Sequence, residues 1–99
     1  MTELNTLIRK SKIRSPKKFQ VILLNDDYTT MEFVVVVIMK FFSKNQEAAN
    51  ALMLKIHIEG EAVCGVYSHD VAQTKVTQVI EFSRENEQPL MCIIRELSD

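Results

Sequence analysis

The chain has 99 residues, of which 46% are hydrophobic and 25% are charged, and this length supplies one domain with a single modest core. The composition excludes a disordered or fibrous protein. No apolar run approaches the roughly 20 residues of a membrane-spanning helix, and no apolar segment follows the N-terminal charges as in a secretory signal, so we expect a cytoplasmic protein.

The net charge of −1 hides an uneven distribution along the chain. Residues 1–18 contain six Lys or Arg and one acidic residue, whereas the remaining 81 residues contain six basic and twelve acidic ones. We therefore predict a flexible basic arm over residues 1–17 and one acidic domain over residues 18–99. Such an arm suits a protein partner or plain solvation better than nucleic acid, because no aromatic side chain stands among its basic residues to stack on bases.

The first elements of the predicted domain flank an acidic turn. The segment KFQVILL, residues 18–24, is rich in β-formers and predicts a strand that is buried on both faces toward its end. The residues NDD then supply turn chemistry. Thr29 and Glu32 match a capping box, so a helix is expected to begin there. The following FVVVVIMKFF has strand propensity, and periodicity alone does not decide, but the length of the run to Phe42 favours a buried helix.

The later elements have clear start and stop signals. Ser43 or Asn45 can cap a second helix that runs to Glu59, and Gly60 stands where such a helix ends. EAVCGVYS then predicts a strand, DVAQTKVTQVIEFSREN a third helix and PLMCIIREL a last strand. The third helix has an apolar stripe that contains Val71, Val76, Val79, Ile80 and Phe82. The order β-α-α-β-α-β indicates a two-layer α+β domain, with helices on one side of a three-stranded sheet and a solvated face on the other.

Asp26, Asp27 and His57 are candidates for acid–base chemistry, but the sequence has no nucleophile elbow, Gly-rich phosphate loop or metal-ligand motif. Adjacent carboxylates more often satisfy local turn amides, so we predict no enzymatic activity. Cys64 and Cys92 each lie in an apolar segment and are expected to be reduced, small hydrophobes. Without a Cys-x-x-Cys or a closely spaced His pair, the sequence predicts neither a zinc site nor another cofactor.

The same polar residues suit a binding site. Met53 and His57 are four residues apart, so they project from one face of the predicted second helix, with Ile56 beside them. If the strand that ends at Asn25 packs near this helix, an amide, carboxylates and an imidazole converge at the rim of an apolar pocket. Such a pocket suits a ligand with a cationic head and an apolar body. The residues alone leave the alternative open that His57 is only a satisfied boundary residue.

Three blocks of the chain carry a family resemblance, namely VILLNDDYTTMEFV, ALMLKIHIEGEAVCGVYSHDVAQTKV and ENEQPLMCII. With their spacing they resemble ClpS, the bacterial adaptors that pass N-degron proteins to the ClpA unfoldase of the Clp protease. The resemblance spans residues 19–94. It implies a three-stranded antiparallel sheet with three helices, as in the C-terminal domain of ribosomal L12. The same resemblance implies that the segment FVVVVIMKFF is a helix rather than a strand. It also implies a monomer that acts on a hexameric unfoldase and needs no cofactor.

The resemblance further implies roles for single residues. Those expected to hold the free α-amino group of a substrate are Asn25, Asp26, Asp27 and His57. Those expected to form the pocket for its first side chain are Leu23, Met31, Val34, Met53, Ile56 and Leu90. Asp70 and Lys75 fall where the family contacts the ClpA N-terminal domain. The chain departs from the family pattern at Gln73, where Glu is usual, and at Thr30, where Pro is common, and the second change is expected to leave the capping box intact.

Three other functions lead to different expectations. A ribosomal-stalk-like interaction module without an N-terminus pocket predicts that His57→Ala is tolerated. A hydrolase built on the acidic turn predicts turnover of a peptide, whereas an adaptor binds the peptide and leaves it unchanged. Nucleic-acid binding by the basic arm predicts an affinity that falls steeply with salt.

Overall fold

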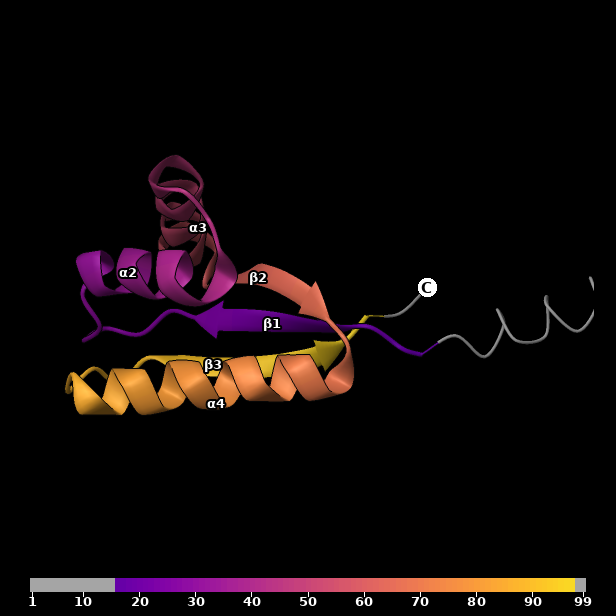
Figure 1. Ribbon diagram of the computed structural model, residues 1–99. Coiled ribbons are helices and arrows are strands. Elements are labelled where there is room, and N and C mark those ends of the chain that lie inside the picture. The colour runs from indigo at the N-terminus through magenta and orange to yellow at the C-terminus, as the bar shows by residue number, and fades with distance from the viewer. Residues whose placement is uncertain (1–15, 98–99) are drawn as a thin grey trace, which may run out of the picture.

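A computed structural model describes residues 16–97, and within this range three strands and three helices follow one another in the predicted order (Figure 1). The elements are β1 (Phe19–Leu24), α2 (Met31–Phe42), α3 (Gln46–Glu59), β2 (Glu61–Tyr67), α4 (His69–Glu85) and β3 (Met91–Glu96). The predicted basic arm lies outside the described residues except for its last two. One of these is Lys17, whose Nζ lies 3.2 Å from a carboxylate oxygen of Glu96. None of the described helices is long and apolar enough to cross a membrane.

The sheet is antiparallel, with β1 in the centre and β2 and β3 on either side of it. Side chains alternate along a strand, so Val21 and Leu23 point into the core that the helices cover, while Ile22 points to the opposite face. All three are fully buried, which confirms that β1 is covered on both faces. Other buried residues of the same core cluster are Val34, Val37, Ile38, Phe42, Ala49, Ile56, Ala62, Cys64, Ala72, Val79, Leu90 and Cys92.

The two cysteines behave as the sequence predicts. Cys64 and Cys92 are free and buried. Burial raises the pKa of each thiol to about 12, so both are neutral at physiological pH. They therefore act as small hydrophobes of the core.

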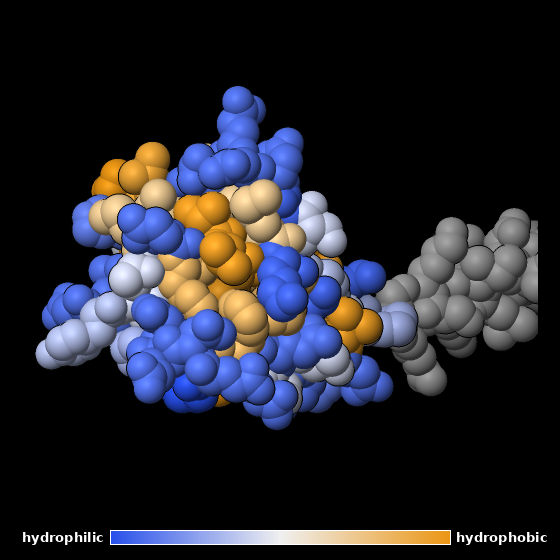
Figure 2. All heavy atoms as spheres, turned by 60° about the vertical axis from the view of Figure 1, so that its left-hand side comes forward, coloured by the Kyte–Doolittle hydropathy of each residue, from blue (hydrophilic) through white to orange (hydrophobic). Residues whose placement is uncertain are grey.

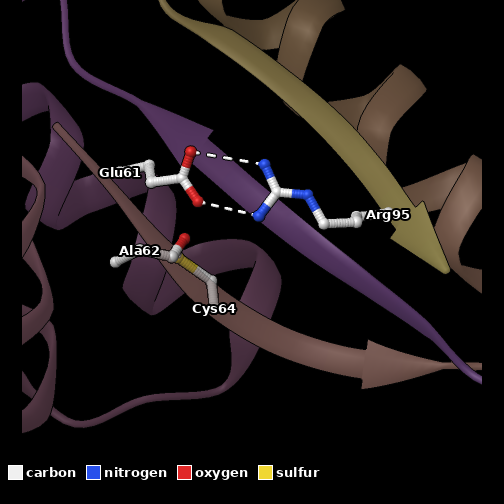
Figure 3. Close-up of polar contacts among 4 residues, drawn as sticks. All are labelled: Glu61, Ala62, Cys64 and Arg95. Atoms are coloured by element: carbon white, nitrogen blue, oxygen red, sulfur yellow. Dashed lines mark hydrogen bonds and ion pairs between the residues drawn. The ribbon is translucent and has the colours of Figure 1, made fainter. Parts of the chain in front are cut away.

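The outer face of the sheet is less solvated at its centre than predicted. Ile22 is fully buried there, beside its cross-strand partners Val63 and Ile93. A bidentate ion pair between Glu61 of β2 and Arg95 of β3 reaches across β1 on this face, with N–O distances of 2.9 and 3.3 Å (Figure 3). The hydrogen bond from the guanidinium lowers the pKa of the Glu61 carboxyl, so this pair is ionised at neutral pH. The face predicted to be solvated is thus buried at Ile22, and around this residue lie the ion pair and the exposed apolar side chains of Val66 and Met91.

The N-terminus of α2 is capped by Thr30 rather than by Thr29. The Thr30 hydroxyl oxygen accepts a hydrogen bond from the N–H of Phe33 at 3.1 Å, whereas the Thr29 hydroxyl donates to Asp26 at 2.6 Å. The predicted capping box of Thr29 and Glu32 is therefore wrong, because the acidic turn uses Thr29 before the helix begins. The helix itself is confirmed, and it buries Val34, Val37, Ile38 and Phe42.

The second helix, α3, begins and ends at predicted signals. Asn45 is its N-cap and accepts a hydrogen bond from the N–H of Ala48 at 2.8 Å. Gly60 ends the helix with a φ of 94°, and its N–H donates to the carbonyl of Ile56 at 2.9 Å. Ser43, the other predicted cap, instead ends α2 in the left-handed region with a φ of 55°.

The third helix, α4, turns a slightly different face inward at its start than predicted. Four of the five predicted stripe residues belong to the core or pack against it, namely Val76, Val79, Ile80 and Phe82. The fifth, Val71, is 45% exposed, and the prediction for it is wrong. Ala72 is the fully buried residue of that turn, because the inward line of the helix passes through it. Near the other end, the rings of Phe82 and Phe33 stack with centroids 5.4 Å apart and join α4 to α2.

Candidate functional site

The acidic turn is held against the end of α3. The N–H of Asn25 donates to the carbonyl of Gly60 at 2.9 Å. His57 lies within the last turn of α3, immediately before this contact. The hydrogen bond therefore brings the turn and the imidazole to the same end of the molecule, and it supplies the convergence that the sequence alone left open.

Asp26 organises the turn from within. Its Oδ1 accepts the N–H groups of Tyr28 and Thr29 at 2.8 and 2.7 Å, and its Oδ2 accepts the Thr29 hydroxyl at 2.6 Å. Partial burial raises the pKa of Asp26, but the hydrogen bonds from Thr29 and Tyr28 together lower it more, so this pKa lies below its usual value. Asp26 is therefore ionised at neutral pH. Because a carboxylate oxygen accepts two hydrogen bonds, Oδ2 keeps one position for a ligand.

A pocket of about 250 Å³ opens between the acidic turn, α2 and α3. Its lining consists of Asn25, Asp26, Asp27, Thr29, Met31, Val34, Met53, Ile56 and His57. Eight of these residues belong to the set that the resemblance implies for substrate binding. Thr29 is the ninth, and sequence reasoning missed it. The signal that could have found it is its position three residues after Asp26, where its N–H and its hydroxyl can both reach the carboxylate.

Two residues expected in the side-chain pocket do not line it. Leu23 and Leu90 are 0% and 1% exposed and belong to the core cluster. Val34 and Ile56, which do line the pocket, are members of the same cluster. Any effect of Leu23 or Leu90 on a ligand must therefore pass through the packing of the core.

The pocket combines acceptor groups with apolar walls. Two carboxylates and the exposed side chains of Asn25 and His57 supply the acceptors, and no Lys or Arg of the described residues lines the space. Met31, which is 43% exposed, and the half-buried Met53 are flexible and polarizable, so they adapt to ligands of different shape. This arrangement can accept a small cationic group that is joined to an apolar one.

The residues expected to contact an unfoldase lie on α4, outside this pocket. Asp70 is fully exposed in the first turn of the helix, 3.6 Å from Nδ1 of His69. Lys75 is half-buried, and its Nζ donates to the carbonyl of Phe41 at 2.7 Å and lies 5.6 Å from the centre of the Tyr67 ring. Lys75 thus satisfies a carbonyl at the C-terminal end of α2, while Asp70 presents its whole side chain to solvent.

Residues 14–93 match the family model described as "ATP-dependent Clp protease adaptor protein ClpS". This chain belongs to the ClpS family. Two relatives, the ATP-dependent Clp protease adapter proteins ClpS of Nitrosospira multiformis and Albidiferax ferrireducens, are 54% and 58% identical over 88 and 85 residues. The alignments cover 89% and 86% of this chain, and 86% and 71% of the relatives.

A solved ClpS structure has the same fold. It is that of Agrobacterium tumefaciens ClpS2 bound to L-phenylalaninamide, which is 36% identical to this chain with a TM-score of 0.80. The match covers 83% of this chain and 99% of that one. The predicted β-α-α-β-α-β architecture is therefore confirmed as the ClpS fold.

Proposed function

We propose that this ClpS protein binds the free α-amino group and the large apolar first side chain of N-degron proteins, and delivers these proteins to the ClpA unfoldase for degradation by ClpP. The observation that carries the proposal is that acceptor groups and apolar side chains line one pocket. The ligand of the Agrobacterium tumefaciens relative, L-phenylalaninamide, also joins an α-amino group to an apolar side chain. The accepted first residues are Leu, Phe, Tyr and Trp.

The polar half of the pocket suits a protein N-terminus. An α-amino group has a pKa of about 7.7 to 8.0, so at neutral pH it is largely a cation with three N–H donors. The amide oxygen of Asn25, a carboxylate of the acidic turn and a neutral imidazole of His57 can each accept one of these hydrogen bonds. A hydrogen bond to a charged group contributes about 1.5 to 3 kcal/mol. Acetylation removes the charge and two donors, so a blocked N-terminus is expected to bind far more weakly.

The apolar half supplies the second requirement. Burying a Leu or Phe side chain contributes about 1.5 to 3 kcal/mol, while association costs several kcal/mol, so neither half of the ligand suffices alone. Pockets for drug-sized molecules span roughly 300 to 1,000 Å³. The pocket of about 250 Å³ therefore suits one residue rather than a longer ligand. A β-branched Ile or Val carries a methyl group near the rim and is expected to bind more weakly than Leu.

The test titrates fluorescent peptides that begin with Leu, Phe or Ile, and an N-acetylated Leu peptide, against the wild type and His57→Ala. We expect micromolar binding of the free Leu and Phe peptides, and at least about tenfold weaker binding of the Ile and acetylated peptides, which corresponds to about 1.4 kcal/mol. His57→Ala is expected to weaken binding of the Leu peptide by a similar factor, because one hydrogen-bond acceptor for the ammonium group is lost.

The matched control is His69→Ala, the other histidine of the chain, which is exposed on α4. Its affinity for the Leu peptide is expected to equal that of the wild type. Equal binding of all peptides, or no binding at all, would contradict the proposal and favour a stalk-like interaction module. The peptides are expected to be recovered unchanged after incubation, because an adaptor performs no chemistry on them.

Delivery requires a second surface, which we assign to the exposed side of α4 around Asp70. This surface is separate from the pocket lining, so an adaptor can hold a substrate and an unfoldase at the same time. The proposed site of action is the cytoplasm, where both partners of the adaptor are expected.

A further inference from the structure

A second hollow of about 470 Å³ lies between α2 and α3 and adjoins the pocket. Its lining consists of Met31, Glu32, Val35, Val36, Met39, Gln46, Asn50 and Met53. Met31 and Met53 line both spaces, so the two are neighbours that share these side chains. We call this second space the α2–α3 groove. Figure 2 turns this side of the domain forward and shows apolar surface gathered into a band between polar borders.

The floor of the groove exposes apolar side chains that the core does not use. Val36 and Met39 are 47% and 39% exposed, although they belong to a helix whose opposite side is fully buried. Contiguous exposed apolar surface on a small protein marks a site of interaction. Because the groove and the pocket share Met31 and Met53, a substrate chain that leaves the pocket over these two side chains enters the groove.

The α3 side of the groove offers hydrogen-bonding groups. Gln46 and Asn50 lie four residues apart on one face of α3, and both are exposed. Within residues 16–97, neither side-chain amide makes a hydrogen bond to another side chain or to the backbone. A side-chain amide offers both a donor and an acceptor, as the backbone of an extended peptide requires.

The length of the groove fits a short segment. Met31 and Met39 are eight residues apart on α2, which corresponds to about 12 Å at about 1.5 Å per helical residue. An extended chain advances about 3.3 Å per residue, so three or four residues span this distance. We propose that the α2–α3 groove holds residues 2 to 4 of the substrate and favours a large apolar side chain among them. This proposal rests on the proposed N-terminus pocket, which holds residue 1.

The test compares four peptides that begin with a free Leu. One carries Ser at positions 2, 3 and 4, and the others replace one of these Ser residues with Phe. Against the wild type we expect at least one Phe peptide to bind about tenfold more tightly than the Ser peptide, as partial burial of an aromatic ring allows. Val36→Gln and Met39→Gln are expected to remove this advantage and to leave the affinity for the Ser peptide unchanged, because neither residue lines the pocket.

The matched control is Val71→Gln, which replaces a valine of the same exposure on another helix, 45% against 47%. This variant is expected to bind the Ser peptide and the Phe peptides as tightly as the wild type does. If the Ser peptide binds and no Phe peptide binds better, or if the groove variants keep the advantage, the groove proposal fails and the N-terminus pocket stands. A fifth peptide is the N-acetylated form of the Ser peptide. If the free and acetylated forms bind equally, or neither binds, the proposed function fails and the groove proposal fails with it. A dimer of the wild type in sedimentation that Val36→Gln abolishes would assign the groove to a second copy instead.

Discussion

At the scale of single residues, Thr29 determines how Asp26 faces the pocket. The Thr29 hydroxyl and N–H contact different oxygens of the Asp26 carboxylate at 2.6 and 2.7 Å, so both oxygens are fixed before a ligand arrives. A group that is already ordered loses less conformational freedom on binding. Thr29 is therefore a positioning residue for the polar half of the pocket, even if it never contacts the substrate.

Thr29→Val keeps the shape of the side chain and removes its hydroxyl. We expect the Kd of a Leu-starting peptide to rise about three- to tenfold, because one hydrogen bond that orients Asp26 is lost. Thr29→Ser keeps the hydroxyl, removes the methyl group and is expected to bind the peptide like the wild type. If Thr29 acted only through packing of its methyl group, Thr29→Ser would instead weaken binding. Thr30→Val is the control beside it in sequence, since it removes the N-cap of α2 and is expected to cost about 1 kcal/mol of stability without changing the Kd. An unchanged Kd in Thr29→Val would refute this role.

The acid stability of the same variant gives a second readout. The hydrogen bonds from Thr29 and Tyr28 outweigh the effect of burial and lower the pKa of Asp26 below 3.8. A carboxyl whose pKa is lower in the folded chain stabilises the fold above its unfolded pKa, and this stabilisation is lost as the pH falls through the folded pKa. Acid unfolding, followed by circular dichroism, is therefore expected to begin at a higher pH in Thr29→Val than in Thr29→Ser.

At the scale of elements, the sequence predicts every helix and strand of the described range. Apart from the outer face of the sheet, which is more buried at Ile22 than predicted, its errors concern which of two neighbouring residues is used. Thr29 and Thr30 are both suitable caps, and the choice between them depends on a hydrogen bond inside the preceding turn. Val71 and Ala72 are likewise adjacent, and the packing of α4 on the sheet makes the smaller side chain the buried one. Periodicity, run length and capping signals together identify an element, while its rotation and first residue depend on tertiary contacts.

The element that we propose for contact with the unfoldase is α4, and its two predicted contact residues differ in the structure. Lys75 bonds the end of α2 at 2.7 Å, so its substitution disturbs the fold as well as any partner. Asp70 is fully exposed, which makes it the cleaner probe. Charge reversal at an exposed interface position replaces attraction by repulsion.

Asp70→Lys is therefore expected to weaken binding to the ClpA N-terminal domain at least about tenfold, or about 1.4 kcal/mol, and to leave the affinity for Leu peptides unchanged. Calorimetry with the isolated ClpA domain measures the first quantity, and the peptide titration measures the second. Glu81→Lys reverses an exposed acidic residue later in the same helix and is the matched control. Equal loss of binding in both variants would indicate a general effect of charge rather than a contact at Asp70.

At the scale of the whole molecule, the site depends on contacts that join distant segments. The hydrogen bond from Asn25 to Gly60 links the end of β1 to the end of α3, and no local pattern predicts it. The resemblance supplied eight lining residues of the pocket because it carries this tertiary information, whereas the residues alone left the convergence open. The α2–α3 groove has no sequence motif, because its two sides come from different helices and meet only when α3 packs beside α2.

The pocket and the exposed side of α4 belong to one small domain, and this leads to a test of delivery as a whole. The degradation assay contains ClpA, ClpP and a Leu-starting reporter, with the adaptor at a concentration well below the Kd values of the variants. His57→Ala and Asp70→Lys are each expected to support degradation at least about tenfold more slowly than the wild type, because the first binds the substrate too weakly and the second binds the unfoldase too weakly. If one molecule must hold both, mixing the two variants restores nothing. Added to the wild type in excess, Asp70→Lys is expected to slow degradation by capturing the reporter, and His57→Ala by occupying ClpA. Recovery of activity in the mixture would instead show that separate molecules can share the task.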